Sequence, residues 1–433
     1  MTNLVWFRND LRVQDNTSLL KASKAEKVIG VYCFETLYFE MGDFGFKKTE
    51  RFRAQFLIES VRELRENLKK FNIPLFIYVG KSSEHIAQLV KKHEIDTIYL
   101  QKEWTRDEVF ISDSVKREVG EAAQFEECYD QFLFHPEDIP YSEFEDIPKV
   151  FTEFRKKCEK YCKVRPEVTF EKVFPENNLL ENYPAVPSLA DLGLSEPITD
   201  SRTAFPFKGG ETQAAKRIEH YFWETKKLAF YKKTRNGLLG TDYSSKLSAW
   251  LANGSISART IYWEVKKFEK EVKKNEDTYW LIFELIWRDF FKYVSLKHGS
   301  KIFWLDGILD KEYDWQLDKS LLDQWMQGNT PDAFVNANMK ELEKTGWMSN
   351  RGRQNVASYW AKELEQDWRY GAAYFESMLI DYDVHSNWGN WMYNSGVGND
   401  PRDRKFNTKL QAERYDPNGK FQKQWLQGSL FDQ

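Results

Sequence analysis

Short apolar runs alternate with longer amphipathic stretches over roughly the first 130 residues, and this alternation limits the fold more than any other feature. Four runs are apolar along their length, as in strands covered on both faces of a parallel sheet: Leu4–Phe7, Val28–Phe34, Leu75–Val79 and Thr97–Leu100. Between the second and third runs, apolar residues recur at helical spacing within Thr49–Phe71. The first run leads into Arg8–Arg12 without the glycines that cradle a dinucleotide. The rhythm predicts a doubly wound, Rossmann-like parallel sheet in an α/β domain.

The chain is long enough for two domains, because 433 residues exceed the size at which a single core keeps growing. Six of the 13 prolines lie between Pro166 and Pro206, which indicates a long linker wrapped on the surface. Beyond residue 210 helices are expected near 211–229, 244–252, 257–274, 277–297, 331–345, 350–364 and 371–382. We predict an α/β domain over residues 1–132, a linker over 133–209 and an all-helical domain over 210–433.

Composition narrows the partners and the compartment. The net charge of −4 excludes a general polyanion binder, so any nucleic-acid contact needs a local patch. The basic run from Lys226 to Arg235 is one candidate, and a solvated helix face is the alternative. Four cysteines fit a reducing compartment, and Cys158 and Cys162 lack the partners of a metal site. Residues 1–15 are too charged for a signal peptide and no apolar run reaches membrane-spanning length, so we expect a cytoplasmic protein.

The stretch Ile380–Tyr393 combines acids, amides and indoles in a way that does not suit a core helix. Asp383 and Asn387 are four residues apart and would share one helix face, with Trp391 one turn further on. Gly389–Asn390 interrupts the helical pattern. Such a face makes a good wall for a large, flat heteroaromatic ligand; the alternative is a helix whose polar C-terminal end frays.

Three further clusters carry binding groups. Residues 240–248 place hydroxyls and a lysine at the expected start of a helix, which suits a diphosphate, although simple capping explains them as well. Glu284 and Arg288 flank Trp287 either as a surface ion pair or as groups that face a cleft. Two arginines within Asn350–Asn355 could hold phosphate of a cofactor or of DNA.

Together these motifs resemble those of the photolyase/cryptochrome family, and most of all its cryptochrome-DASH branch. The resemblance runs almost end to end through Trp6–Arg12, Phe44–Thr49, Tyr243–Ser248, Glu284–Phe291, Asn350–Asn355, Asp367–Gly371, Ile380–Tyr393 and Gln422–Leu426. It implies an α/β antenna domain joined by a long linker to an all-helical domain that binds FAD.

The resemblance also implies which residues hold the cofactor. By motif position, FAD would be bound by Tyr231, Ser244, Ser245, Lys246, Leu247, Ser248, Arg288, Arg353, Asp381, Asp383 and Asn387, with Asn387 at flavin N5. Trp391, Trp368 and Trp315 match tryptophans that carry electrons from the surface to the flavin in the family, and the alternative for each is an aromatic core residue.

The implied activity is that of a photolyase-type lyase: light drives an electron from reduced FAD into a cyclobutane pyrimidine dimer flipped out of the strand. The positions expected to face the dimer are Glu284, Trp287, Asn350, Gln354 and Tyr393, and those expected to hold the DNA backbone are Arg235, Lys292 and Arg351. The alternative is a cryptochrome-type blue-light photoreceptor that binds nucleic acid without repairing it.

Three departures from the family patterns bear on the substrate. Gln354 and Tyr393 stand where duplex-acting relatives tend to carry Met and Trp, and this more polar pocket implies single-stranded or looped DNA. Ser349–Asn350 replaces the paired histidines of (6-4) photolyases, so the proton donor of that chemistry is missing. The segment Thr330–Asn336 also departs from the usual pattern, without an evident physical reason.

A second chromophore is implied as well. Glu103 matches an acid that holds the pterin of a 5,10-methenyltetrahydrofolate antenna in relatives, and Lys48, Arg53 and Phe56 could line the same pocket between the domains. The alternative for Glu103 is an ordinary acid at the end of a strand. We expect a monomer.

Overall fold

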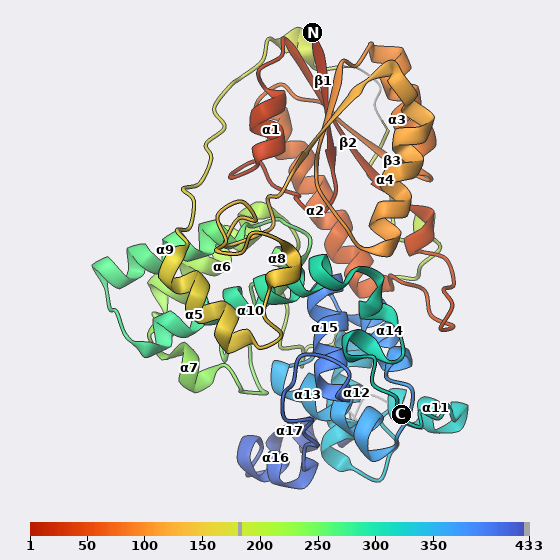
Figure 1. Ribbon diagram of the computed structural model, residues 1–433, viewed down its shortest axis with the longest axis vertical. Coiled ribbons are helices and arrows are strands. Elements are labelled where there is room, and N and C mark those ends of the chain that lie inside the picture. The colour runs from red at the N-terminus through yellow and green to blue at the C-terminus, as the bar shows by residue number, and fades with distance from the viewer. Residues whose placement is uncertain (181–183, 428–433) are drawn as a thin grey trace.

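The structure is a computed structural model that describes residues 1–180 and 184–427. Its N-terminal part is built on a five-stranded, wholly parallel sheet of order β3-β2-β1-β4-β5 (Figure 1). The strands are β1 (Thr2–Phe7), β2 (Lys27–Phe34), β3 (Leu75–Val79), β4 (Thr97–Gln101) and β5 (Gln124–Cys128). The first four match the predicted runs, so the predicted doubly wound sheet is confirmed.

Helices cover both faces of the sheet, each over a core of its own. They are α1 (Thr17–Ala22), α2 (Arg51–Lys69), α3 (Ser82–His93) and α4 (Arg106–Val119). Alternate residues of β1 point to opposite faces, so Val5 and Phe7 pack beneath α1 and α2 whereas Leu4 and Trp6 pack beneath α3 and α4. The sequence does not predict β5, because this edge strand contains Glu126 and Glu127 in place of an apolar run.

The second part of the molecule is helical. Its helices are α6 (Glu211–Ile218), α7 (Tyr231–Thr234), α8 (Ser248–Ala252), α9 (Ala258–Glu271), α10 (Glu276–His298), α11 (Lys319–Met326), α12 (Ala333–Thr345), α13 (Asn350–Ser358), α14 (Trp368–Met378), α15 (Val384–Ser395), α16 (Thr408–Tyr415) and α17 (Lys420–Leu426). The long α10 lies at the centre, with α7, α9 and α15 packed against it. This confirms the predicted helical architecture.

Two predicted helices and one predicted interruption differ in detail. In the region 211–229 the α-helical geometry ends with α6, and the chain continues as the π-helical segment Glu219–Glu224. The helix near 244–252 is only α8, because Lys246 has a left-handed backbone with φ of 63°. The expected interruption at Gly389–Asn390 does not occur, and α15 runs through it unbroken. A side chain at Gly389 would clash with the ring of Phe291, so this glycine allows close helix packing.

The connecting segment, for which we propose residues 133–209, packs against both parts. At its start the carboxylate of Asp289 on α10 accepts hydrogen bonds from the backbone N–H groups of Leu133 and Phe134 at 2.8–3.0 Å. It then forms α5 (Phe151–Tyr161), a helix that the sequence does not predict, and returns along the outer edge of the α/β part (Figure 1).

The segment Thr330–Asn336 forms a closed turn before α12. The Asn336 carboxamide oxygen accepts from the backbone N–H and the hydroxyl of Thr330 at 2.8 and 2.7 Å, and its Nδ2 donates to the Thr330 carbonyl at 2.7 Å. Asp332 caps the helix through the Val335 N–H at 2.9 Å. These reciprocal bonds give a physical reason for the unusual sequence of this turn.

A buried ion cluster joins the α/β and helical parts. Arg259 on α9 pairs with Asp15 and with Asp130, both at 2.7 Å, and Arg12 lies 3.5 Å from Asp130. All four side chains are almost fully buried. Because Arg259 of the helical part pairs with two carboxylates of the α/β part, the cluster should make the two parts depend on each other.

We expect the Arg259→Met variant to lose about 3–5 kcal/mol of unfolding free energy, since removing this arginine leaves the buried carboxylate of Asp15 without a cation and Asp130 with Arg12 alone. Denaturant unfolding followed by circular dichroism measures this loss. The matched control is Arg165→Met, whose partners Glu137 and Asp138 are at the surface and whose loss should stay near ~0–1 kcal/mol. Equal losses in the two variants would contradict a stabilising role for the buried cluster.

Candidate functional site

A cavity of about 490 Å³ opens between α8, α10, α13 and α15, and we name it the helical cavity. Its volume lies within the range of roughly 300–1,000 Å³ usual for ligand sites. The predicted residues that line it are Tyr231, Arg235, Ser244, Ser245, Lys246, Leu247, Ser248, Glu284, Trp287, Arg288, Asn350, Arg351, Arg353, Gln354, Asp381, Asp383 and Tyr393. Of the residues predicted to contact flavin, dimer or DNA, Asn387 and Lys292 lie outside this wall.

The loop before α8 is held in place by a buried arginine. The guanidinium of Arg217 donates to the carbonyl oxygens of Ser244 and Ser245 at 3.0 and 2.9 Å and pairs with Asp242 at 2.8 Å. Arg217 belongs to no motif, so sequence reasoning missed it; only its place on the apolar face of α6 marks it as unusual. With the loop carbonyls bound to Arg217, the loop's side chains can turn toward the cavity.

Lys246 in this loop has a buried amino group without a hydrogen-bond partner among the described residues. Its Nζ lies 3.2 and 4.6 Å from the ring centroids of Tyr243 and Trp347. Burial holds the pKa of Lys246 well below its ordinary value and raises the pKa of nearby Glu341 to about 8. A buried cation without a partner is costly unless an anion binds beside it, so this side of the cavity fits a diphosphate.

The start of α15 and its neighbours line the opposite wall with three charges. Arg353 Nη2 donates to both carboxylate oxygens of Asp381 at 2.9 and 3.0 Å. Asp383 caps α15 by accepting from the Ser386 N–H at 2.8 Å, and it pairs with Lys292 at 2.9 Å. Burial alone would raise the pKa of Asp383, but Lys292 holds that pKa well below its ordinary value. Asp383 is therefore a fixed negative charge at this wall.

Lys292 is where the structure contradicts a predicted role. Its side chain is about 4% exposed and points from α10 toward α15, where it meets Asp383. A lysine in this position cannot reach a DNA backbone in solvent. The sequence pattern could not separate the two roles, because a helical lysine near a motif looks the same whether it faces the cleft or the neighbouring helix.

Asn387 and Trp391 meet in a smaller cavity that adjoins the helical cavity through Arg353 and Asp381. Asn387 Nδ2 donates to the Ala372 carbonyl oxygen at 3.0 Å, which fixes its amide against α14. The two residues that the resemblance places nearest to the flavin ring are thus side by side, one turn apart on α15.

The three predicted relay tryptophans lie on connected segments. Gly371 stands one turn after Trp368 on α14, and a side chain there would clash with the Trp391 ring. Trp315 lies beside Gln316, which forms a parallel bridge with Gln366 just before α14. Trp391 and Trp368 are fully buried, whereas Trp315 is partly exposed. Trp315 therefore lies nearest the surface of the three, and the order of Trp391 and Trp368 in the relay stays a prediction.

On the side that is predicted to face the dimer, Trp287 presents one free face among the described residues. Its other face stacks on Phe151 of α5, with ring centroids 3.6 Å apart and planes 12° apart. The edge of Tyr393 meets it at a centroid distance of 6.0 Å. Glu284, one turn earlier on α10, pairs with Arg235 at 2.7 Å. Phe151 lies in the predicted linker, where no sequence signal linked it to the site.

Two arginines hold the polar residues of this side. Arg404 Nη2 donates to the Tyr393 hydroxyl at 2.9 Å, and Arg351 Nη1 donates to the Gln354 amide oxygen at 3.0 Å. Arg404 lines the helical cavity and was missed; the basic cluster around it at Arg402–Lys405 is the signal that could have found it. Both polar side chains therefore hold a charged partner at the mouth of the cavity.

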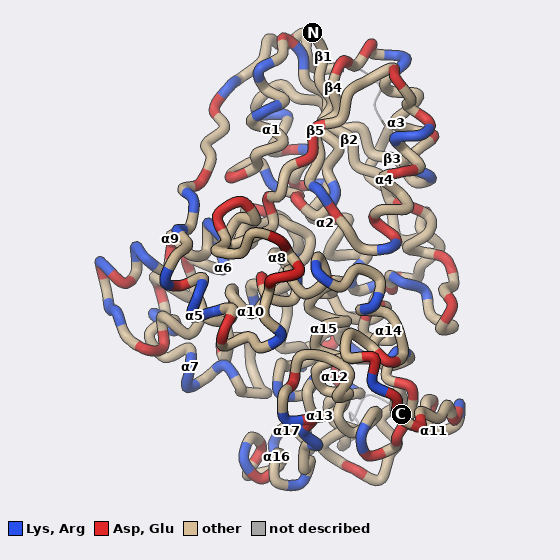
Figure 2. Tube along the Cα trace, viewed as in Figure 1, with Lys and Arg blue, Asp and Glu red and all other residues tan. Residues whose placement is uncertain are grey.

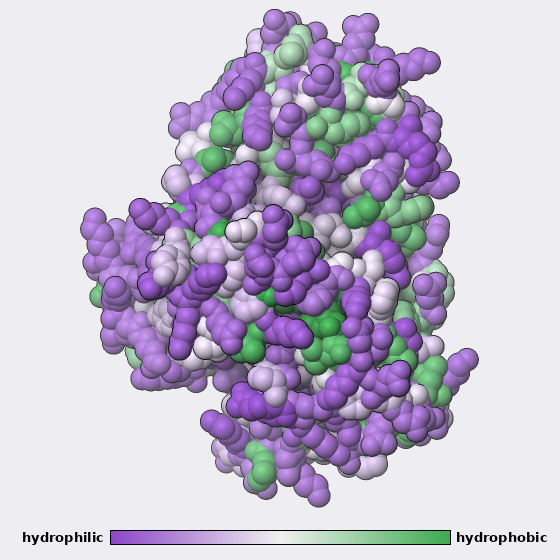
Figure 3. All heavy atoms as spheres, viewed as in Figure 1, coloured by the Kyte–Doolittle hydropathy of each residue, from purple (hydrophilic) through white to green (hydrophobic). Residues whose placement is uncertain are grey.

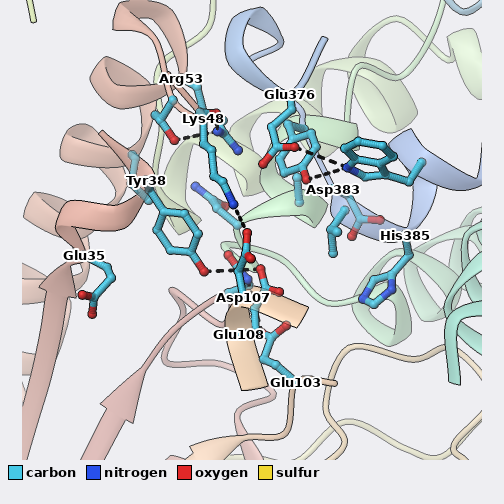
Figure 4. A pocket seen from close by; sticks show the side chains of 18 of the residues that line it. Glu35, Tyr38, Lys48, Arg53, Glu103, Asp107, Glu108, Glu376, Asp383 and His385 are labelled. Atoms are coloured by element: carbon cyan, nitrogen blue, oxygen red, sulfur yellow. Dashed lines mark hydrogen bonds and ion pairs between the residues drawn. The ribbon is translucent and has the colours of Figure 1, made fainter. Parts of the chain in front are cut away.

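A second cavity lies between the α/β and helical parts, and we name it the interdomain cavity (Figure 4). All four predicted antenna residues line it. Glu103 accepts from Asn9 and Gln101 at 3.2 and 3.0 Å, and burial raises its pKa. Lys48 forms an ion pair with Asp107, and Arg53 stacks over Tyr382 at 4.5 Å. Phe56 contributes less to the lining, because its ring is buried against Phe205 and Trp250.

Comparison with known proteins accounts for this architecture. Residues 3–175 match the family model for DNA photolyase, and residues 280–428 match that for the FAD binding domain of DNA photolyase. A cryptochrome DASH of Xenopus laevis is 46% identical over 426 residues, covering 97% of this chain and 81% of that protein. The chain belongs to the photolyase/cryptochrome family. Another relative, the cryptochrome DASH of Gloeobacter violaceus, is 45% identical over 98% of this chain and 85% of its own.

Solved structures of the family agree with the fold. The cryptochrome of Synechocystis sp. PCC6803 superposes with a TM-score of 0.94 at 43% identity, covering 98% of this chain and 88% of its own. An archaeal photolyase from Sulfolobus tokodaii, described with two FAD molecules, superposes with a TM-score of 0.80 at 26% identity. The match covers 99% of this chain and 90% of that chain. The predicted family, its DASH branch and the two-part fold are confirmed, and the match to the FAD binding domain supports FAD as the cofactor.

In this member of the family the two cavities share part of one wall. Ala252, Arg288 and Asp383 line both, and Lys292 reaches the interdomain cavity beside Asp383. Arg288 donates to the Leu251 carbonyl oxygen at 3.1 Å, which ties α10 to α8. The partition between the cavities is therefore the Asp383–Lys292 pair together with Arg288.

The surface carries mixed charge. Acidic and basic residues are interspersed along the whole trace, with basic segments at α7, α16 and α17 (Figure 2), and the face seen in Figure 3 is mostly hydrophilic with separate apolar patches. Within the described residues, no helix has both the length and the apolar character that crossing a membrane requires. The same part of the chain gathers no group of three His, Cys, Asp or Glu side chains suited to a metal ion.

Proposed function

We propose that this protein is a light-driven, FAD-dependent photolyase-type lyase that repairs cyclobutane pyrimidine dimers, mainly in single-stranded or looped DNA. The observation that carries the proposal is that one cavity joins a flavin wall, made of Arg353, Asp381 and Asp383, to a stacking wall made of Trp287 and Tyr393. The family includes proteins named photolyase, which supports this chemistry.

Bound FAD in its reduced form supplies the electron that splits the dimer. The chain's own residues bind and orient. Lys246 and the neighbouring serines would neutralise and hold the diphosphate. Arg353 and Asp383 would fix the flavin ring beside Asn387, whose amide is already held against α14. Because Arg353 lies on α13, and Asp383 and Asn387 lie at the start of α15 and within it, these three side chains need no large rearrangement when the cofactor binds.

On the opposite wall, the free face of Trp287 would stack on one base of the dimer, a contact worth on the order of 1–3 kcal/mol. The Glu284–Arg235 pair lies beside it and offers hydrogen bonds to the base edges and to the backbone. Arg351 and Arg404 at the mouth would hold flanking phosphates, so binding should weaken as salt rises.

The cofactor assignment predicts that truncation of both Asp383 and Asn387 to alanine lowers FAD occupancy strongly. The double variant removes the fixed carboxylate and the amide that face the flavin and leaves Lys292 unpaired. The ratio of flavin to protein absorbance in purified protein measures occupancy. Asp383→Asn is the control, because the amide still caps α15 at Ser386. Full occupancy in the double variant would rule out this wall as the flavin site.

The function is tested with a single-stranded oligonucleotide that contains one cyclobutane thymine dimer. We expect reduced protein to restore the two thymines under blue light and not in the dark. If the bound flavin responds to light while the dimer stays intact, the protein is a blue-light photoreceptor instead. If neither occurs with flavin bound, both readings fail.

We also propose that the interdomain cavity holds the pterin ring of a 5,10-methenyltetrahydrofolate antenna. Its volume of about 160 Å³ is below the roughly 300–1,000 Å³ usual for ligand sites, so we expect the pterin ring to lie inside it and the tail to extend outside. Glu103, Lys48 and Arg53 would provide the polar contacts.

This proposal predicts near-ultraviolet absorbance beyond that of FAD in protein purified with its folate, and its loss in the Glu103→Gln variant. The substitution keeps the shape and a hydrogen-bonding amide but removes the carboxylate that would accept from the pterin. Flavin absorbance serves as the internal control, since Glu103 lies outside the helical cavity. An unchanged spectrum would show that Glu103 does not hold the antenna.

A further inference from the structure

A compact group of charges surrounds Tyr313 on the surface side of Trp315. The two rings are 5.1 Å apart between centroids, with planes inclined by 49°. The Tyr313 hydroxyl donates to Asp403 Oδ2 at 2.6 Å, and Lys362 Nζ lies 3.2 Å from the same hydroxyl. Lys311 also donates to it. None of these residues belongs to the motifs of the family resemblance.

Asp403 is equipped to take a proton from this hydroxyl. It pairs with Lys311 at 2.7 Å and with Lys362 at 2.5 Å. Burial alone would raise the pKa of Asp403, but hydrogen bonds from Lys311, Lys362 and Tyr313 lower it to about 2. The carboxylate is therefore ionised at neutral pH and bonded to the phenol before any reaction begins.

Trp315 lacks such an acceptor. Its indole N–H is buried and has no hydrogen-bond partner within the described residues. An indole that has lost an electron becomes a much stronger acid at this N–H, and here the proton has no protein group to receive it. A positive charge that arrives on Trp315 is therefore not trapped there.

We propose that Tyr313 is the terminal electron donor of the light-driven relay, beyond Trp315. This inference rests on the proposed flavin photochemistry and extends it by one named residue and its proton acceptor. The relay as far as Trp315 follows from the family resemblance, whereas the added step depends on the contact between Tyr313 and Asp403.

The step balances as a proton-coupled electron transfer. The oxidant would be the Trp315 radical cation, which the relay tryptophans would form by passing an electron inward to light-excited FAD when FAD is bound. Tyr313 gives one electron to Trp315, which returns to neutral indole, and the O–H proton moves 2.6 Å to the Asp403 carboxylate. The products are a neutral tyrosyl radical, a protonated Asp403 and a closed-shell Trp315. Both lysines can then donate to the tyrosyl oxygen.

A rival route branches inward from Trp391. Trp325 lies 6.1 Å from Trp391 and Trp360 lies 5.3 Å from Trp325. Both rings are fully buried, and their N–H groups donate to backbone carbonyl oxygens, which do not accept a proton. This branch ends without a base, so charge that enters it should return. Of the two routes, the one that ends at Tyr313 has a carboxylate, Asp403, hydrogen-bonded to its last aromatic residue and able to accept a proton.

Transient absorption and electron paramagnetic resonance after a blue flash test the proposal on the FAD-loaded protein. We expect a tyrosyl radical in the wild type, its loss in Tyr313→Phe with a tryptophan radical in its place, and a reduced tyrosyl yield in Asp403→Asn. Tyr262→Phe is the control, since Tyr262 is a half-buried tyrosine next to Trp263 and away from the relay. A wild type that stops at a tryptophan radical, or an unchanged tyrosyl signal in Tyr313→Phe, would overturn the assignment.

A second arm separates this proposal from the flavin chemistry. An added one-electron photo-oxidant, excited at wavelengths that flavin does not absorb, oxidises surface tryptophans without the internal relay. A tyrosyl radical in the wild type that Tyr313→Phe lacks would support the role of Tyr313 even if flavin photoreduction fails. If flavin photoreduction proceeds but neither arm yields a tyrosyl radical, the proposed function stands and this inference falls.

Discussion

The Trp391→Phe variant is expected to bind FAD normally and to photoreduce it at least ~100-fold more slowly than the wild type, since each ~59 mV of extra potential corresponds to about tenfold in a one-electron step. Phenylalanine is harder to oxidise than tryptophan by many times that amount. It still packs between Phe375 and Trp325, whose rings lie 5.1 and 6.1 Å from that of Trp391. The rate of flavin reduction under blue light with an external reductant measures the effect.

The matched control is Trp325→Phe. Trp325 is as deeply buried as Trp391 and touches it, but it lies on the branch without a proton acceptor. We expect this variant to photoreduce nearly as fast as the wild type. If Trp391→Phe also matched the wild type, the electron would enter by another path, and the order Trp391, Trp368, Trp315 would be wrong.

Repair should be faster by about 100-fold on single-stranded than on fully paired DNA, because flipping a dimer out of a duplex costs a few kcal/mol. A pocket with two apolar faces could offset this cost by stacking. Here one face of Trp287 is already covered by Phe151, and the polar side chains Gln354 and Tyr393 line the same cavity. Both polar groups are bound to arginines, so a dimer that pushes against them must displace charged partners.

The measurement compares repair rates of one dimer in matched single- and double-stranded oligonucleotides at fixed salt. The structure offers a gain-of-function control: the double variant Gln354→Met and Tyr393→Trp removes the bonds to Arg351 and Arg404 and restores apolar surface. It should repair duplex DNA faster than the wild type with little change on single strands. Equal rates on both substrates in the wild type would contradict the role of pocket polarity.

Much of the fold could be predicted because its signals are local. The strands β1 to β4 are apolar runs, so they stand out, whereas β5 contains Glu126 and Glu127 in place of such a run and does not. The helix near 244–252 was overestimated because the left-handed backbone at Lys246 depends on contacts of Arg217 from another helix. Gly389 is read from the sequence as a helix break, but in the structure the ring of Phe291 fills the space that a side chain at this position would take.

The candidate site divides in the same way. Residues on recognisable motifs meet in the helical cavity, because a motif preserves the spacing that brings its side chains to one place. The sequence predicts that Lys292 contacts DNA, whereas in the structure it pairs with Asp383. Which way a side chain points from a helix depends on the neighbouring helices, and these cannot be read from the motif. The sequence does not predict Phe151 or Arg404, since Phe151 supports Trp287 from a helix of the predicted linker and Arg404 reaches the cavity from a loop outside the motifs.

The shared wall of the two cavities has a consequence for how the molecule handles light. Arg288 and Lys292 stand one turn apart on α10; Arg288 lines both cavities and Lys292 lines the interdomain cavity, so ligands in both would be positioned by the same helical turn. Thermal motion of one part of the molecule against the other would then change the distance and mutual orientation of two chromophores very little. Excitation transfer depends steeply on both quantities, so its efficiency should stay constant with temperature until α10 itself unfolds.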